Sequence, residues 1–274
     1  MDTLLALPSF FVVFILGASI GSFLNVVIYR VPAGLSVLYP PSRCPQCLHK
    51  LGLRENIPVF GWLALGGRCH HCRTNISPRY PIVEAVTGLI FLCVFWQFDL
   101  SIQTLGYWTF CSWLLALSLI DLDTMTLPDS LTQSGLILGL IFQFFVGSTT
   151  TQNSLTGAIN QLMSGIIGAV LGIWLLNLIT IFGSLILGQA AMGWGDSKLA
   201  AMMGAWLGWK YLLLASFIAC ALGAFIGGGA IALKLINRRQ PMPFGPFLAM
   251  GAALVVFWGE WLLAIYVRWF FPIS

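Results

Sequence analysis

Two aspartates stand where hydrophobic stretches of the sequence meet polar turns. Asp121 follows the apolar stretch Trp113–Ile120, and Asp196 closes the run Gly193-Trp194-Gly195-Asp196, shortly before another apolar stretch. Only nine of the 274 residues are acidic, and ionisable groups at membrane depth are costly enough to suggest a function. The two aspartates are therefore the first candidates for chemistry.

Two carboxylates that reach one water molecule can divide the work of hydrolysis between them. One ionises and activates the water, while the other stays protonated and polarises the scissile carbonyl. Gly193 and Gly195 would let backbone approach Asp196 or an extended substrate where a side chain would block it. The plainer interpretation is that the acids of the Asp121–Asp129 turn are helix caps or solvated turn residues. Spacing alone leaves both interpretations open.

The composition is that of a membrane protein. Hydrophobic residues make up 58% of the chain, charged residues 8%, and the mean hydropathy is +0.91, whereas soluble domains have about 25% charged residues. Apolar runs of about 20 residues mark spanning helices. We expect an all-α polytopic membrane protein with about eight transmembrane helices, over these ranges: Ser9–Tyr29, Pro81–Phe98, Ile102–Ile120, Leu131–Val146, Leu162–Leu187, Leu199–Trp209, Tyr211–Ile236 and Phe244–Val267.

The distribution of Lys and Arg predicts the orientation in the membrane. Seven of the thirteen lie between Arg30 and Arg79, in the only long polar segment, and cytoplasmic loops are enriched in these residues. Counting helices from this loop places the amino terminus in the periplasm. It also places both aspartate-containing turns on the cytoplasmic face.

The polar segment contains two Cys-x-x-Cys pairs. Cys44 and Cys47 form the first pair, Cys69 and Cys72 the second, with 21 residues between them. Each turn presents two thiolates to one ion, so the pattern predicts a tetrahedral zinc site in a small cytoplasmic loop domain. Four cysteine ligands indicate structural rather than catalytic zinc. Disulfides are the alternative, although a cytoplasmic loop is a reducing environment.

Together the motifs resemble bacterial type IV prepilin peptidases, which are bifunctional leader peptidases and N-methyltransferases. The resemblance extends along nearly the whole chain. Besides the cysteine pairs it rests on these stretches: Gly21-Ser22-Phe23-Leu24-Asn25-Val26-Val27, Glu55-Asn56-Ile57-Pro58, Gly66-Gly67-Arg68, Arg79-Tyr80-Pro81-Ile82-Val83-Glu84, Ile120-Asp121-Leu122-Asp123, Leu127-Pro128-Asp129 and Pro243-Phe244-Gly245-Pro246.

The resemblance implies a Gly-x-Gly-Asp aspartic peptidase of the bacterial inner membrane. Asp121 and Asp196 match the catalytic aspartates of the family. The implied substrates are prepilins and pseudopilins of type IV pili and type II secretion systems, whose basic leader is cleaved between Gly and Phe. The new amino-terminal Phe is then methylated with S-adenosylmethionine. The positions expected to support catalysis are Asp123, Asp129, Gly193, Gly195 and Glu84.

Two further expectations concern charge and the methyl donor. Acids such as Glu84 would attract the basic leader, or Glu84 would pair with Arg79. No Gly-x-Gly-x-x-Gly follows a strand, so no Rossmann-type domain is apparent. Resemblance and elimination place S-adenosylmethionine near the zinc loop, with Gly66, Gly67 and Glu55 as candidate contacts.

The expected division of the chain has three parts. Residues 1–30 form the first helix, residues 31–79 the zinc-binding loop domain, and residues 80–274 the peptidase core. The alternatives are a zinc-stabilised membrane scaffold without catalysis, or a peptidase without methyltransferase activity. A transporter would place charged or broken helices near the membrane midplane, and a nucleic-acid partner is not expected.

Overall fold

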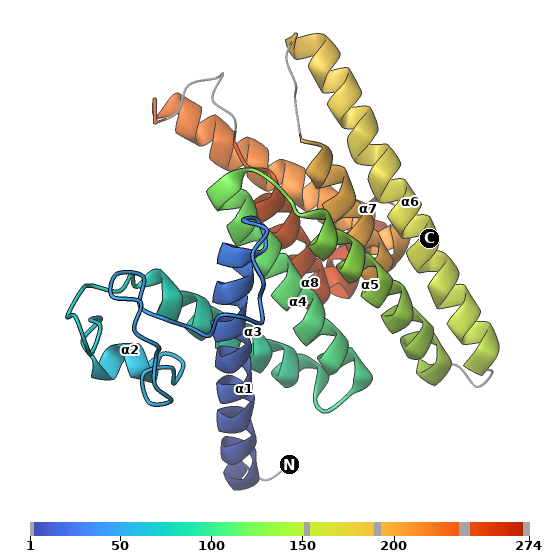
Figure 1. Ribbon diagram of the computed structural model, residues 1–274. Helices are drawn as coiled ribbons and strands as arrows, with labels where there is room; N and C mark the ends of the chain where they lie inside the picture. Colours follow the sequence, from blue (N-terminus) through green and yellow to red (C-terminus); the bar gives the residue numbers. More distant parts are fainter. Residues whose placement is uncertain (1–2, 151–153, 189–192, 236–241, 271–274) are drawn as a thin grey trace. The chain divides into compact units, whose positions relative to one another are not determined.

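The computed structural model describes residues 3–150, 154–188, 193–235 and 242–270. These residues are almost entirely helical (Figure 1), and seven of their helices are long and apolar enough to cross a membrane. The protein is therefore a multi-pass membrane protein, as its composition predicts. The helices are α1 (Thr3–Arg30), α2 (Phe60–Ala64), α3 (Arg79–Phe98), α4 (Ile102–Thr124), α5 (Asp129–Thr150), α6 (Ser154–Leu187), α7 (Trp194–Ala232) and α8 (Gly245–Phe270).

The chain divides into two compact units, Met1–Ala116 and Leu117–Ser274, with the boundary inside α4. In the first unit α1 packs along α3. The two helices come very close at Gly21, where a Cβ would lie only 2.7 Å from the Cα of Glu84. The first part of α4 joins this pair through Trp108, whose ring stacks on that of Phe91 at 4.8 Å between centroids.

In the second unit α6 packs against α5 and α7, and α8 packs against α7. The contact between α6 and α7 is made by glycines, since a Cβ on Gly204 would overlap the carbonyl of Gly168. Small residues let helix backbones approach closely in lipid, where burial of apolar side chains gives little driving force. This contact fixes the half of α7 that carries Asp196.

Helix α7 is broken at Gly208, which has φ 76° and ψ 169°, a region used essentially only by glycine. Figure 1 shows α7 as a V, in orange, whose two ends lie on the same side. The side-chain Nε2 of Gln143 donates to the carbonyl of Trp206 at 2.9 Å. This hydrogen bond gives a partner to one backbone carbonyl near the break. The seven spanning helices thus contain the eight expected segments, because Leu199–Trp209 and Tyr211–Ile236 meet at this glycine. Ile236 itself lies outside the described residues.

The expectation that both aspartates lie in turns is wrong. Helix α4 continues to Thr124, beyond the expected end at Ile120, so it includes Asp121, and α7 begins at Trp194, so Asp196 lies in its first turn. The expected ends followed the loss of hydrophobicity. A helix does not have to end where the side chains become polar, however. Its backbone N–H and C=O groups can continue to hydrogen-bond to each other in the polar region.

Candidate functional site

Asp121 and Asp196 line one cavity of about 250 Å³ in the second unit. Both are buried, with exposed fractions of 5% and 6%. Helix α4 supplies one aspartate at its carboxyl end, and α7 supplies the other at its amino end. The structure therefore brings together the two residues that the sequence singled out. The other lining residues are Met125, Thr126, Leu127, Gly193, Trp194, Gly195 and Lys198.

The carboxylate of Asp121 is held by the start of α8. The backbone N–H of Gly245 donates to Oδ2 of Asp121 at 2.9 Å. A Cβ on Gly245 would lie 2.7 Å from the same oxygen, so a side chain there would collide with the carboxylate. Because Gly245 is the first residue of α8, the positive end of that helix dipole also faces Asp121.

The two glycines before Asp196 have different roles in the structure. A Cβ on Gly195 would lie 3.0 Å from the Cβ of Leu127, so Gly195 allows close packing against this buried side chain. A Cβ on Gly193 would make only ordinary contact with Asp196, at 3.7 Å from Oδ2. Gly193 instead precedes α7, and its carbonyl accepts the N–H of Asp196 at 3.2 Å.

The remaining predicted acids lie outside the cavity lining. Asp129, at the start of α5, is paired with Lys198 of α7 at 2.5 Å between Oδ1 and Nζ, and both side chains are about half exposed. Lys198 lines the cavity, but Asp129 does not. Asp123 is exposed and is likewise absent from the lining. Glu84 belongs to the first unit, where it lines a different cavity.

The two cysteine pairs form two equivalent turns in the first unit. In the first turn the N–H of Cys44 donates to the carbonyl of His49 at 2.9 Å, and the N–H of Leu48 donates to the carbonyl of Cys44 at 3.0 Å. The second turn repeats both bonds around Cys69. Leu48 and Arg73 occupy matching positions, and both have φ 58°. Each turn directs its two sulfurs toward those of the other.

The four sulfurs have the spacing of a tetrahedral zinc site. All four lie within 4.8 Å of one another, with 3.7 Å between Cys44 and Cys72 and 4.0 Å between Cys47 and Cys69. Ligands at about 2.3 Å around tetrahedral zinc are about 3.8 Å apart, whereas a disulfide bond is about 2.05 Å long. The donor set therefore fits structural zinc.

Hydrogen bonds within the turns set the acid–base state of the thiols. The backbone N–H and then the side chain of Thr74 lower the pKa of Cys72 to about 6. At Cys47 the N–H of His49 acts in the same direction, but burial and the neighbouring thiols outweigh it and raise the pKa to about 12. Because zinc takes thiolates, binding at this site would release the protons that the four thiols still hold, including that of Cys47.

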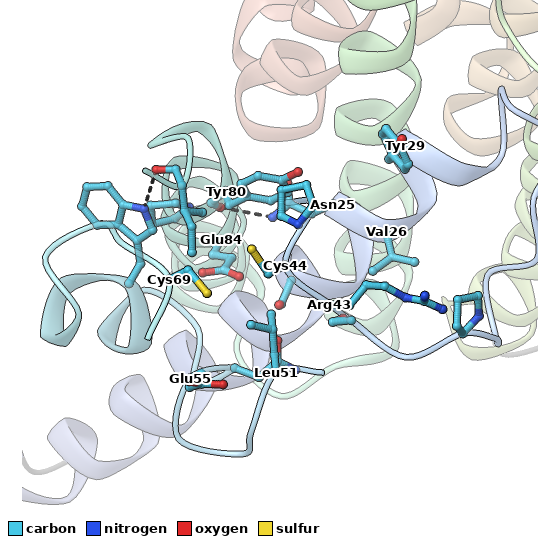
Figure 2. Close-up of a pocket in the computed structure, with 18 of the residues that line it drawn as sticks. Asn25, Val26, Tyr29, Arg43, Cys44, Leu51, Glu55, Cys69, Tyr80 and Glu84 are labelled. Atoms are coloured by element: carbon cyan, nitrogen blue, oxygen red, sulfur yellow. Dashed lines mark hydrogen bonds between the residues drawn. The ribbon is translucent and has the colours of Figure 1, made fainter. Parts of the chain in front are cut away.

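A second, larger cavity of about 510 Å³ lies between the zinc loop and the ends of α1 and α3. Figure 2 shows Asn25 of α1 and Tyr80 and Glu84 of α3 on its walls, with Glu55 from the loop. The side chain of Asn25 donates to the carbonyl of Tyr80 at 3.1 Å, which ties the two helix ends together.

Of the three residues expected to contact the methyl donor, only Glu55 lines this cavity. Its Oε2 accepts the N–H of Gly52 at 2.6 Å. Gly67 does not line the cavity, but it lies against the ring of Trp62, which does. A Cβ on Gly67 would lie 2.7 Å from that ring. Gly66 has open space around it.

Sequence reasoning missed two contacts that the structure makes clear. Gly245 contacts Asp121 although the two are 124 positions apart in the sequence. The sequence did contain a signal for this contact, the run Pro243-Phe244-Gly245-Pro246. That run resembles the family, but the sequence assigned no role to it. Glu84 accepts the N–H of Val59 at 2.7 Å. No local pattern around Val59 indicates that contact.

The fold and the site define the class of this protein. It is a multi-pass membrane protein with two buried carboxylates in one cavity. Comparison with known proteins gives the family. Residues 15–98 match the bacterial peptidase A24 N-terminal domain, and residues 108–228 match the type IV leader peptidase family. The chain belongs to the type IV leader peptidase family and is an enzyme of that family.

Relatives with the name prepilin leader peptidase/N-methyltransferase align over nearly the full length. The protein of Stutzerimonas stutzeri is 37% identical over 278 residues, covering 93% of this chain and 92% of the relative. The protein of Pseudomonas aeruginosa is 36% identical over 294 residues, covering 98% and 97%. No solved structure shows significant similarity to the chain.

Proposed function

We propose that this protein removes the leader from type IV prepilins and pseudopilins and then methylates the new amino terminus with S-adenosylmethionine. The relatives carry both activities in their name. The observation that most directly supports cleavage is the cavity that brings Asp121 and Asp196 together. Pairs of carboxylates in a shared, partly desolvated site are suited to activating water against a peptide carbonyl.

The environment of each aspartate suggests how the pair divides its work. The N–H of Gly245 donates directly to the carboxylate of Asp121 and favours its charged form, so we assign Asp121 as the base. The helix dipoles do not distinguish the two aspartates, because Asp196 itself lies in the first turn of α7. Asp196 then holds the proton that polarises the scissile carbonyl between Gly and Phe. Asp121 takes a proton from the attacking water, and the tetrahedral intermediate collapses as the Phe nitrogen receives a proton from the dyad.

The 510 Å³ cavity of the first unit is our candidate site for methyl transfer. Its volume lies within the range of small-molecule sites, about 300–1,000 Å³. Aromatic walls including Trp62 and Tyr80, together with the carboxylate of Glu55, suit a sulfonium cation. When bound, S-adenosylmethionine supplies an electrophilic methyl group. Cys44 and Cys69 also line the cavity, so zinc held there would order one of its walls.

The proposed setting is the bacterial inner membrane, with the amino terminus in the periplasm. The concentration of Lys and Arg between Arg30 and Arg79 supports a cytoplasmic zinc loop. Leader cleavage on the same face would let a basic leader be processed before its hydrophobic segment leaves the membrane. The products would serve type IV pili or type II secretion.

Cleavage is tested with purified protein in lipid and a prepilin-like peptide that carries a basic leader, Gly-Phe and a hydrophobic segment. We expect Asp121→Asn and Asp196→Asn each to abolish cleavage as measured by intact mass, while helical content and bound zinc stay unchanged. Adding S-adenosylmethionine to wild-type protein should give a product with one additional methyl group.

Two results would overturn the assignment. Wild-type cleavage rates in either asparagine variant would exclude that aspartate from the chemistry. A wild-type protein that leaves every leader intact would favour the alternative of a zinc-stabilised membrane scaffold.

A further inference from the structure

Val59 adopts a backbone conformation that a β-branched residue rarely takes. Its φ is 62° and its ψ −55°, and the N–H of Phe60 donates to the carbonyl of Pro58 at 2.6 Å. These values describe a γ-turn with positive φ, a form that is rare and strained. Positive φ at a β-branched residue is an outlier. Such strain persists only where surrounding contacts hold it.

The carboxylate of Glu84 is the contact that holds this turn. Its Oε2 accepts the N–H of Val59 at 2.7 Å, and Glu84 is 9% exposed. Ser22 of α1 also hydrogen-bonds the Glu84 side chain. Because Gly21 has no side chain, α1 comes close enough to α3 for this arrangement. One carboxylate therefore joins α1, α3 and the turn before α2.

The turn at Val59 determines where α2 places a wall of the larger cavity. Val59 directly precedes α2, and Trp62 of α2 lines the cavity. The indole Nε1–H of Trp62 donates to the carbonyl of Ile76 at 3.1 Å. Glu84 lines the same cavity and lies on its wall in Figure 2. A strained turn beside a cavity points to a conformation kept for a function.

We propose that Glu84 is a positioning residue for the methyl-donor cavity. Its carboxylate holds the strained turn at Val59 and thereby sets α2 and Trp62 against the donor. This inference rests on the proposed methyltransferase function. The positioning role requires a hydrogen-bond acceptor at position 84 and does not require a negative charge. Attraction of a basic leader, in contrast, would require the charge.

The test compares Glu84→Gln with Glu84→Ala in the full chain, reconstituted in lipid. Glutamine keeps an acceptor oxygen for Val59, and alanine removes it. With a pre-cleaved pilin peptide as methyl acceptor, we expect Glu84→Ala to raise the KM for S-adenosylmethionine about ten- to a hundredfold. Glu84→Gln should stay close to wild type. Zinc content and helical content serve as folding controls and should be unchanged in both variants.

A second substitution tests the strain itself. Glycine adopts positive φ without a steric penalty, so Val59→Gly in the Glu84→Ala background should recover part of the lost affinity. Hydrogen exchange of the segment 57–64 gives a readout that is independent of methyl transfer. Exchange there should be faster in Glu84→Ala and unchanged in Glu84→Gln.

The outcomes separate the proposal from the function on which it rests. Equal defects in the alanine and glutamine variants would assign Glu84 a charge-dependent role and overturn positioning. Unchanged KM and exchange in Glu84→Ala would overturn it as well. A wild-type protein that cleaves leaders but never methylates would instead overturn the methyltransferase function, while the exchange rates would still report on the Glu84–Val59 contact.

Discussion

The absence of a side chain at Gly245 allows the start of α8 to reach Asp121. The hydrogen bond of 2.9 Å to Oδ2 fixes one carboxylate of the pair, and the position has no room for a Cβ. Gly193, which flanks Asp196, does have room for a side chain, because a Cβ there would make only ordinary contact. The two aspartates are therefore constrained differently, in agreement with different roles in the proposed reaction.

Gly245→Ala should therefore reduce leader cleavage by about a hundredfold, because a misplacement of about 1 Å at a reacting group has an effect of this size. Initial rates of cleavage of the prepilin-like peptide measure the change. Gly228→Ala is the matched control, since a Cβ there meets nothing within 4 Å, and it should cleave normally. Normal cleavage by Gly245→Ala would show that the contact does not position Asp121.

Among the helices, α7 is the element whose shape matters most for the site. Its first half carries Asp196 and packs against α6 through the close contact of Gly204 with Gly168. The break at Gly208 then reverses the direction of the chain. A straight helix of 39 residues would be far longer than the roughly 20 that cross a bilayer. The break lets both halves pack within one unit.

Gly208→Ala should destabilise the protein by about 1–3 kcal/mol, because alanine at this φ and ψ is strained and its Cβ would lie 2.6 Å from Oγ of Ser164. Thermal unfolding in detergent measures the change. Gly229→Ala, where the added Cβ meets nothing within 4 Å, should leave the transition unchanged. Equal stability of Gly208→Ala and wild type would mean that the break tolerates an ordinary residue.

At the scale of the whole molecule, the two candidate chemistries belong to different units. The aspartate cavity is formed entirely by residues of the second unit, and the cysteines with the larger cavity belong entirely to the first. Residues 15–98 and 108–228 match two separate family descriptions, which follow the same order along the chain. Cleavage and methylation should therefore be separable by substitution.

Cys72→Ser should remove the bound zinc, about one ion per chain in wild type, and should abolish most of the methylation while leader cleavage persists. The physical reason is that the loop carrying the four cysteines has little core of its own, so zinc bound there would supply much of its folding energy. Metal analysis and the two activity assays measure the effects. Cys93→Ser is the control, because Cys93 is an exposed thiol on α3 outside the cysteine cluster. Methylation by a zinc-free Cys72→Ser protein would contradict the proposed role of the loop.

The sequence alone determined the features that depend on local pattern. Hydrophobic runs predicted the helical membrane fold, and the spacing of Cys44, Cys47, Cys69 and Cys72 predicted a cluster that the structure assembles. Both features follow from short-range rules, namely the length needed to cross a bilayer and the geometry of a Cys-x-x-Cys turn. The scarcity of acids likewise singled out Asp121 and Asp196.

Only the tertiary structure decided how distant segments meet. That Gly245 contacts Asp121, that Glu84 holds Val59, and that Gly195 makes room for Leu127 are properties of packing between helices. Sequence pattern records which face of a helix is apolar. It does not record which glycine on one helix faces which carboxylate on another, because that depends on the crossing and register of packed helices.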